Sequence, residues 1–244
     1  MPGRAMLTRM RTIGVLGGMS SVASGEYYRL LNEGVNARLG GHSAAEIVLY
    51  SVDFAVMEQF IRDEAWQAAG EYLALRAAAL ERAGAEVVLL ATNTFHRVAP
   101  QIEAALGVPF VHIVDVTADA AQADGVSTVG LLGTAPVMEA AFYRDRFAGH
   151  GIAVLVPPAT DRAVVHRVIF DELTHGVVSP ASRGQYVRIM ADLVARGAQA
   201  VVLGCTEISL LVGPVDLPGT TLYDTTALHV ARAVELALAE PVPG

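Results

Sequence analysis

The sequence contains one cysteine, Cys205, and a threonine, Thr92, at the equivalent position of a repeated segment. Residues 84–94 read G-A-E-V-V-L-L-A-T-N-T, and residues 197–207 read G-A-Q-A-V-V-L-G-C-T-E. Alignment of the two segments without gaps places Thr92 on Cys205. Each segment has an apolar run typical of a buried strand, followed by small polar residues. A thiol and a hydroxyl therefore follow equivalent predicted strands, and both groups can carry a proton.

Two proton-carrying groups on opposite faces of one carbon are what a cofactor-independent racemase or epimerase requires. One group removes the proton from one face, and the other returns a proton to the opposite face. The proton α to a carboxylate is very weakly acidic, so the enediolate that forms needs preorganised hydrogen-bond donors. Loops that enter helix N-termini supply free backbone N–H groups and a favourable dipole. We expect the same environment to lower the pKa of the Cys205 thiol.

Two further repeats occur in the same order along the chain. Residues 12–18 read T-I-G-V-L-G-G and residues 128–134 read T-V-G-L-L-G-T, while the Val-Pro pair at 108–109 recurs as Leu-Pro at 217–218. The three ordered matches have spacings of 116, 113 and 109 residues and indicate an internal duplication. Strand-like and helical segments alternate in each half. We predict an α/β fold of two pseudo-symmetric domains, each with a parallel sheet between two helical layers.

Ligands of open parallel sheets bind beyond the carboxyl ends of the strands. The predicted site therefore lies in the cleft between the two domains. Cys205 is expected to be the base, and Thr92 is expected to lie across the ligand from it. The remaining candidate substrate-binding residues follow predicted strands or open predicted helices: Met19, Ser51, Asn93, Thr94, Thr134, Thr206 and Glu207.

Structural roles compete with several of these assignments. The Thr-Asn-Thr run at 92–94 is also typical of a helix cap, and Glu207 suits the first turn of a helix. Asp115 and Asp224 match at the spacing of 109 residues and are candidates for helix capping or for orienting other site groups. Three histidines are expected to be hydrogen-bonded structural residues and not catalytic bases: His96, His112 and His229.

Composition argues against several classes of function. The formal net charge of −8 argues against nucleic acid as a partner, and no apolar run approaches the ~18 residues of a membrane span. All 17 basic residues are arginine, so no lysine can bind pyridoxal phosphate or complete a P-loop. No His, Cys or Asp spacing resembles a metal site, so we expect neither cofactor nor metal. The lone cysteine and the lack of a signal-peptide pattern are expected of a cytoplasmic protein.

Seven segments resemble the aspartate/glutamate racemase superfamily, and they extend over essentially the whole chain. The nearest branch is that of broad-specificity and L-aspartate/glutamate-specific amino acid racemases. The segments are G-V-L-G-G-M-S (14–20), Y-Y-R-L-L-N-E-G (27–34), S-V-D-F (51–54), A-T-N-T-F-H (91–96), L-L-G-T (131–134), I-F-D-E-L (169–173) and L-G-C-T-E-I (203–208).

The resemblance implies cofactor-free, two-base proton transfer in a homodimer. The implied substrates are amino acids, with L-Asp and L-Glu favoured. The resemblance also implies that the chain crosses twice between the domains. Residues 1–106 and 214–244 would then form the first domain, and residues 107–213 would form the second.

The chain departs from the family pattern at two places. The family usually has a cysteine where this chain has Thr92, and a hydroxyl is a far poorer base than a thiolate. Aspartate racemases of the family also bind the substrate carboxylates with an arginine and a lysine. Lysine is absent here, and S-V-D-F occupies the region where the arginine is expected. The sequence therefore leaves open which residue recognises the substrate side chain.

Two other functions remain alternatives to racemisation. A cofactor-free decarboxylase of malonate-type acids would use Cys205 to protonate the enediolate left after CO₂ departs, as in relatives that keep only the second cysteine. A catalytically silent ligand-binding relative would explain the missing first cysteine. Racemisation is the leading prediction, because A-T-N-T resembles the racemase version of this loop.

Overall fold

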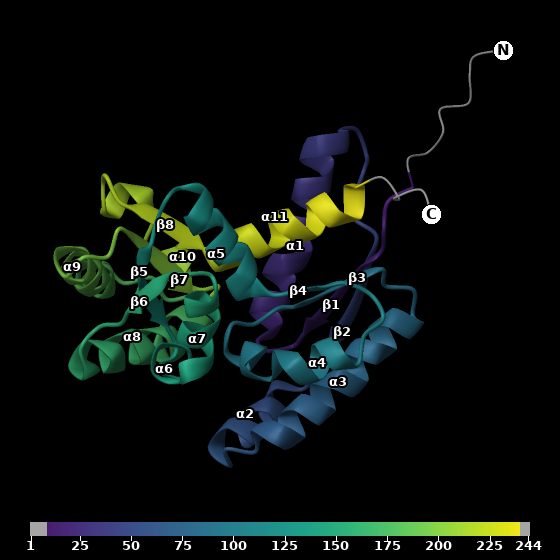
Figure 1. Ribbon diagram of the computed structural model, residues 1–244, viewed down its shortest axis with the longest axis horizontal. Helices are drawn as coiled ribbons and strands as arrows, with labels where there is room; N and C mark the ends of the chain where they lie inside the picture. The colour runs from purple at the N-terminus through teal and green to yellow at the C-terminus, as the bar shows by residue number, and fades with distance from the viewer. Residues whose placement is uncertain (1–8, 240–244) are drawn as a thin grey trace.

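Two parallel four-stranded sheets form the centres of the two halves of the chain (Figure 1). The computed structural model describes residues 9–239. The first sheet has the order β2-β1-β3-β4 and contains β1 (Ile13–Gly17), β2 (Ile47–Ser51), β3 (Val87–Leu90) and β4 (Phe110–Val111). The second has the order β6-β5-β7-β8 and contains β5 (Thr128–Gly133), β6 (Ala153–Leu155), β7 (Ala200–Gly204) and β8 (Thr221–Asp224). The repeated strand order confirms the α/β fold and the duplication.

Helices connect the strands and cover both faces of each sheet. Those before β4 are α1 (Ser21–Leu39), α2 (Phe54–Arg62), α3 (Trp66–Arg82), the 3₁₀ helix η1 (Thr94–Val98) and α4 (Ala99–Ala104). Those after β4 are α5 (Ile113–Ala123), α6 (Ala135–Glu139), α7 (Ala141–Gly149), α8 (Ala159–Asp171), η2 (Leu173–His175), α9 (Pro180–Ala195), α10 (Ile208–Leu211), η3 (Pro214–Asp216) and α11 (Thr225–Leu238). Within residues 9–239, no helix is both long enough and apolar enough to cross a membrane.

Each sheet divides the core of its domain into two layers, because successive side chains along a strand point to opposite faces. In the first sheet, Leu16 packs toward α3 and α4, whereas Val15 packs toward α1 and α11. In the second sheet, Leu203 packs toward α8 and α9, whereas Val202 packs toward α5 and α7. Apolar residues on both faces of a strand are typical of a parallel sheet that helices cover on both sides.

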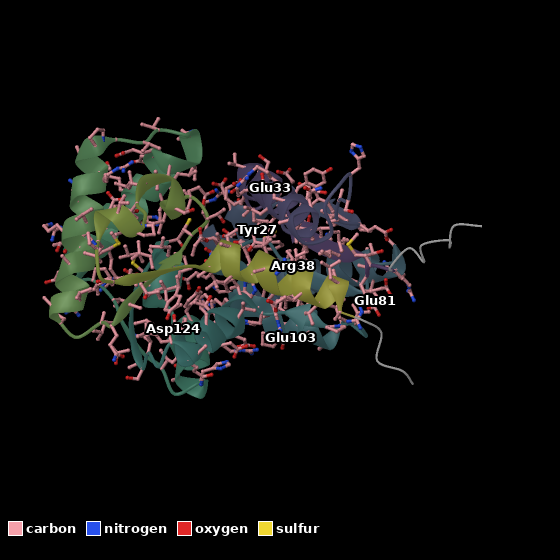
Figure 2. All side chains as sticks on the ribbon, turned by 90° about the horizontal axis from the view of Figure 1, so that it is seen from above. Tyr27, Glu33, Arg38, Glu81, Glu103 and Asp124 are labelled. Atoms are coloured by element: carbon pink, nitrogen blue, oxygen red, sulfur yellow. The ribbon has the colours of Figure 1, made fainter. Side chains whose placement is uncertain are left out.

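The chain crosses between the domains after the fourth strand of each half. β4 pairs with β3 in the first sheet, but α5 packs on the second domain through Ile113 and Ala121. β8 pairs with β7 in the second sheet, but α11 packs on the first domain through Val230 and Val234. Figure 1 shows α11 extending from the second domain over the first. In Figure 2, Tyr27 of α1 lies beside α11.

The crossings correct the predicted domain boundaries. The first crossing falls at residue 113 instead of 107, and the second falls at residue 225 instead of 214, because each half completes its own sheet before it crosses. The fourth strand of the first sheet, β4, is correspondingly short and ends at Val111. Residues 1–8 and 240–244, which the prediction placed in the first domain, lie outside the described residues.

The two crossing helices, α5 and α11, begin at equivalent points. Nδ1 of His112 accepts a hydrogen bond from the backbone N–H two residues later, at 3.2 Å, and Oδ1 of Asp224 does the same at 2.9 Å. Both residues are N-caps, so His112 is the equivalent of Asp224. The predicted match to Asp115 is wrong, because the chain from Pro218 to the cap of α11 is three residues longer than the corresponding segment of the first half. Asp115 lies inside α5 and pairs instead with Arg146, at 2.6 Å.

Candidate active site

A cavity of about 360 Å³ lies between the two domains, where the loops after β1, β3, β5 and β7 meet. Its walls include eight of the nine predicted site residues: Met19, Thr92, Asn93, Thr94, Thr134, Cys205, Thr206 and Glu207. Ser51 is the exception. It lies at the exposed end of β2, an edge strand, and α2, which begins at Phe54, supplies the wall of the cavity instead.

Cys205 follows β7, and the side chain of Glu207 lies beside it. The Cys205 thiol donates a hydrogen bond to Oε2 of Glu207 at 3.0 Å. Burial of the sulfur, the charge of Glu207 and this hydrogen bond raise the pKa of the Cys205 thiol well above its ordinary value. The backbone N–H groups of Thr206 and Glu207 act to lower that pKa but do not outweigh the other causes. The expected lowering of the thiol pKa is therefore wrong, and Cys205 keeps its proton in contact with an acceptor.

Glu207 is buried and connects the thiol to the first domain. Its Oε1 accepts a hydrogen bond from Oγ of Ser20 at 3.5 Å. The same Ser20 hydroxyl caps α1, because it accepts a hydrogen bond from the N–H of Ala23 at 3.2 Å. Ser20 is absent from the predicted site residues, although a serine that follows a glycine turn and precedes a helical pattern is an N-cap signal. Glu207 thus contacts Cys205 with one oxygen and Ser20 with the other.

Thr92 reaches the same cavity from the first domain, directly after β3. Its carbonyl accepts a hydrogen bond from Nδ1 of His96 at 2.6 Å, and Nε2 of His96 accepts one from the N–H of Ile113 at 3.2 Å. The ring is therefore neutral, with its hydrogen on Nδ1. Burial and the nearby His112 and His229 lower the pKa of His96 well below its ordinary value. His96 thus fixes the Thr92 loop, which is the structural role expected of it.

The neighbouring polar residues make contacts across the domain boundary. Nδ2 of Asn93 donates a hydrogen bond to Oγ1 of Thr225 at 3.2 Å, and Oδ1 of Asn93 accepts one from the hydroxyl of Tyr143 at 2.8 Å. Oγ1 of Thr94 lies 3.0 Å from Oγ1 of Thr134. These contacts bring the predicted carboxylate-binding groups of the two domains together. They also give Asn93 a positioning role that the sequence pattern does not reveal.

Comparison with known proteins agrees with this geometry. The profile of the Asp/Glu/Hydantoin racemase family matches residues 16–233. The chain belongs to this family. A Yersinia pestis crystal structure assigned to the Asp/Glu racemases is 45% identical, covers 94% of this chain and 100% of its own, and has a TM-score of 0.89. An aspartate racemase homologue from Pyrococcus horikoshii is 32% identical, with 93% and 99% covered and a TM-score of 0.83.

A curated relative is more distant. The broad specificity amino-acid racemase RacX of Bacillus subtilis is 22% identical over 169 residues, which are 66% of this chain and 68% of RacX.

In this Asp/Glu/hydantoin racemase family member, residues of α2, α8 and η2 also line the cavity. We call this surface the helical wall, and it consists of Phe54, Glu58, Ile61, Ile169, Phe170, Thr174 and His175. Its titratable members are Glu58 and His175, and no arginine within residues 9–239 lines the cavity. No sequence motif singles out Glu58. Residues 9–239 contain no group of three or more His, Cys, Asp or Glu side chains placed to hold a metal ion.

Proposed function

We propose that the protein is a cofactor-independent amino acid racemase, in which Cys205 removes the Cα proton and the Thr92 side returns one. Family membership supports the reaction class, which is isomerisation. The observation that carries the proposal is the position of Cys205 and Thr92. Each comes from its own domain, both line one cavity, and a carboxylate lies 3.0 Å from the thiol.

The thiol first transfers its proton to Oε2 of Glu207. The resulting thiolate takes the Cα proton of the L enantiomer and leaves an enediolate. On the opposite face, the Thr92 hydroxyl donates a proton to Cα and is reprotonated by water. The hydroxyls of Thr94, Thr134 and Thr206, together with backbone N–H groups at the loop ends, would hold the substrate carboxylate and the enediolate oxygens. The sulfur keeps the proton taken from Cα, and Glu207 gives its proton to the hydroxide left when water reprotonates Thr92, which restores the starting site.

The finer prediction, that L-Asp and L-Glu are favoured, has support from the names of the similar structures. The helical wall gives it no support, because no arginine contributes to the cavity lining described above. The proposed function is therefore racemisation of amino acids, with the side-chain class decided by the helical wall.

Deuterium incorporation at Cα from solvent tests the proposal. The panel contains both enantiomers of several amino acids and malonate-type acids, without pyridoxal phosphate and with a chelator present. We expect exchange from L-amino acids and a loss of at least about 100-fold in Cys205→Ser, whose fold is checked by circular dichroism. Near wild-type exchange in Cys205→Ser would contradict the role of the thiol.

The same panel separates the alternatives. Release of CO₂ from malonates without Cα exchange from amino acids would identify a decarboxylase. The apolar members of the helical wall are compatible with decarboxylation, because departing CO₂ needs an apolar pocket. Binding without exchange or CO₂ release would identify a silent relative.

A further inference from the structure

The cavity contains two carboxylates, Glu207 at the thiol and Glu58 on the helical wall, and within residues 9–239 its lining includes no arginine. An amino acid substrate brings a third carboxylate at its α position, which the hydroxyls and N–H groups at the loop ends would hold. A substrate with a side-chain carboxylate brings a fourth. That group would face Glu58 and apolar side chains, with no arginine in the lining to neutralise it. Like charges that share a partly enclosed site repel strongly.

Glu58 occupies a defined position on α2. Phe54, Glu58 and Ile61 are four and three residues apart, so they share one face of the helix. All three line the cavity, and Glu58 lies between the two apolar side chains. The helix is fixed by its N-cap, Asp53, whose Oδ1 accepts a hydrogen bond from the N–H two residues later at 3.0 Å. On the other side, the buried Met57 anchors α2 in the core of the first domain.

The arginines on the two wall helices do not replace the missing cation. Arg62 lies one turn after Glu58, where its Nη1 is 3.9 Å from the Glu58 carboxylate and its Nη2 donates a hydrogen bond to Gln59 at 2.7 Å. On α8, Arg162 lies 3.0 Å from the carboxylate of Glu139, and Arg167 lies 3.5 Å from that of Glu172. None of these three arginines lines the cavity. Arg62 therefore weakens the charge of Glu58 from outside the wall without offering a donor to a substrate inside it.

We propose that Glu58 is a specificity-determining residue that disfavours side-chain carboxylates, so that the site takes amino acids whose side chains are uncharged or cationic. The proposal rests on the racemase function above. Apolar members of the helical wall would contact the aliphatic part of such a side chain. The carboxylate of Glu58 would tolerate an amide or accept a hydrogen bond from an ammonium group.

L-Gln and L-Glu form the matched substrate pair, because they have nearly the same shape and differ by one charge. The measurement is kcat/KM for Cα deuterium exchange from each. We expect the wild type to favour L-Gln by at least about tenfold, which corresponds to about 1.4 kcal/mol. Glu58→Gln should lower the ratio of L-Gln to L-Glu several-fold. Glu71→Gln, on the exposed surface of α3, removes the same charge away from the cavity and should leave the ratio unchanged.

Arg62→Gln decides between two roles of that arginine. If Arg62 only weakens the charge of Glu58, its removal raises the preference for L-Gln. If Arg62 turns inward to bind a substrate carboxylate, its removal selectively lowers exchange from L-Glu, and the proposal is wrong. Wild-type exchange that is equal or faster from L-Glu, or a ratio that Glu58→Gln does not change, also overturns it. Absence of exchange from every amino acid would instead overturn the racemase function itself.

Discussion

The proton of the Cys205 thiol lies between two atoms that can hold it, the sulfur and Oε2 of Glu207, 3.0 Å apart. Glu207 raises the pKa of the thiol and so opposes spontaneous formation of a thiolate. The same carboxylate is the acceptor in contact with the thiol. Glu207 therefore has two effects of opposite sign, one on the reactivity of the free cysteine and one on catalysis.

Glu207→Gln separates these two effects. Loss of the carboxylate lowers the pKa of Cys205, so alkylation of the free thiol by iodoacetamide at pH 8 should become faster. Loss of the proton acceptor should lower kcat by about 100-fold or more. An increase in both rates would show that Glu207 only restrains the thiol and takes no part in proton transfer.

Because Thr92 is a hydroxyl where the family usually has a thiol, we expect the rate of Cα proton abstraction to differ between the L and D enantiomers. By resemblance to the family, the second cysteine serves the L face, so Cys205 should abstract the proton of L-amino acids and the Thr92 hydroxyl should abstract that of D-amino acids only slowly. The free energies of the two enantiomers are equal, so the asymmetry lies in the rates. Thr92→Cys should speed initial deuterium incorporation from the D enantiomer by tenfold or more, with little effect on the L enantiomer. Equal wild-type rates from both enantiomers would contradict this assignment.

At the scale of elements, a cluster of buried histidines lies where β4, α5 and α11 meet. The ring centroids of His96 and His112 are 4.6 Å apart, and those of His96 and His229 are 5.8 Å apart. Nε2 of His229 contacts the carbonyl of Val111 at 2.7 Å, and Nδ1 contacts the hydroxyl of Tyr27 at 2.9 Å. Burial, then the charge of Arg146, lowers the pKa of His112 to about 3, and burial lowers that of His229 to about 4.

This cluster predicts destabilisation by mild acid. In the unfolded chain a histidine titrates near pH 6.5, whereas in the folded protein the pKa values of about 3 for His112 and about 4 for His229 keep both rings neutral at pH 5. The stability that depends on neutral rings is therefore fully present above pH 6.5 and is lost as the pH falls toward the folded pKa values. Between pH 7 and pH 5, each buried histidine should cost about 2 kcal/mol.

His112→Asn tests how much the His112 ring contributes to the loss of stability between pH 7 and pH 5. Asparagine is a good N-cap and does not titrate, so α5 should begin as before. The fall in urea midpoint between pH 7 and pH 5 should be smaller than in the wild type by one histidine's contribution. His42→Asn, in an exposed turn, is the control. An unchanged fall in His112→Asn would mean that this ring does not set the acid sensitivity.

At the scale of the whole molecule, the duplication made most of the fold predictable. The repeats at 12–18 and 84–94 mark β1 and β3, and their copies mark β5 and β7, because buried parallel strands need continuous apolar runs. These strand ends place eight of the nine predicted residues around one cavity. The predicted boundaries placed each crossing before the fourth strand instead of after it, because an apolar run marks a strand but does not show which sheet the strand joins.

Other features depend on contacts that no local pattern encodes. The spacing of 109 residues paired Asp224 with Asp115, because an aspartate pattern does not reveal a three-residue difference in loop length. The raised pKa of Cys205 depends on where the side chain of Glu207 points. Glu58 belongs to an ordinary amphipathic helix, and only the packing of α2 makes that face part of the cavity wall.

The exchange of α5 and α11 between the domains has a consequence for the history of the fold. Without α11, the β1 and β3 face that it shares with α1 would expose Val15 and Leu89 to water, and the second sheet would likewise lose α5. Neither half of the chain is thus a self-sufficient folding unit. In a single-copy ancestor, two copies could exchange their last helices in a domain-swapped dimer, so that the helix of each copy buried this face of the other. Fusion of two such genes would then have made an intermolecular exchange intramolecular and left each copy free to change its own reactive residue.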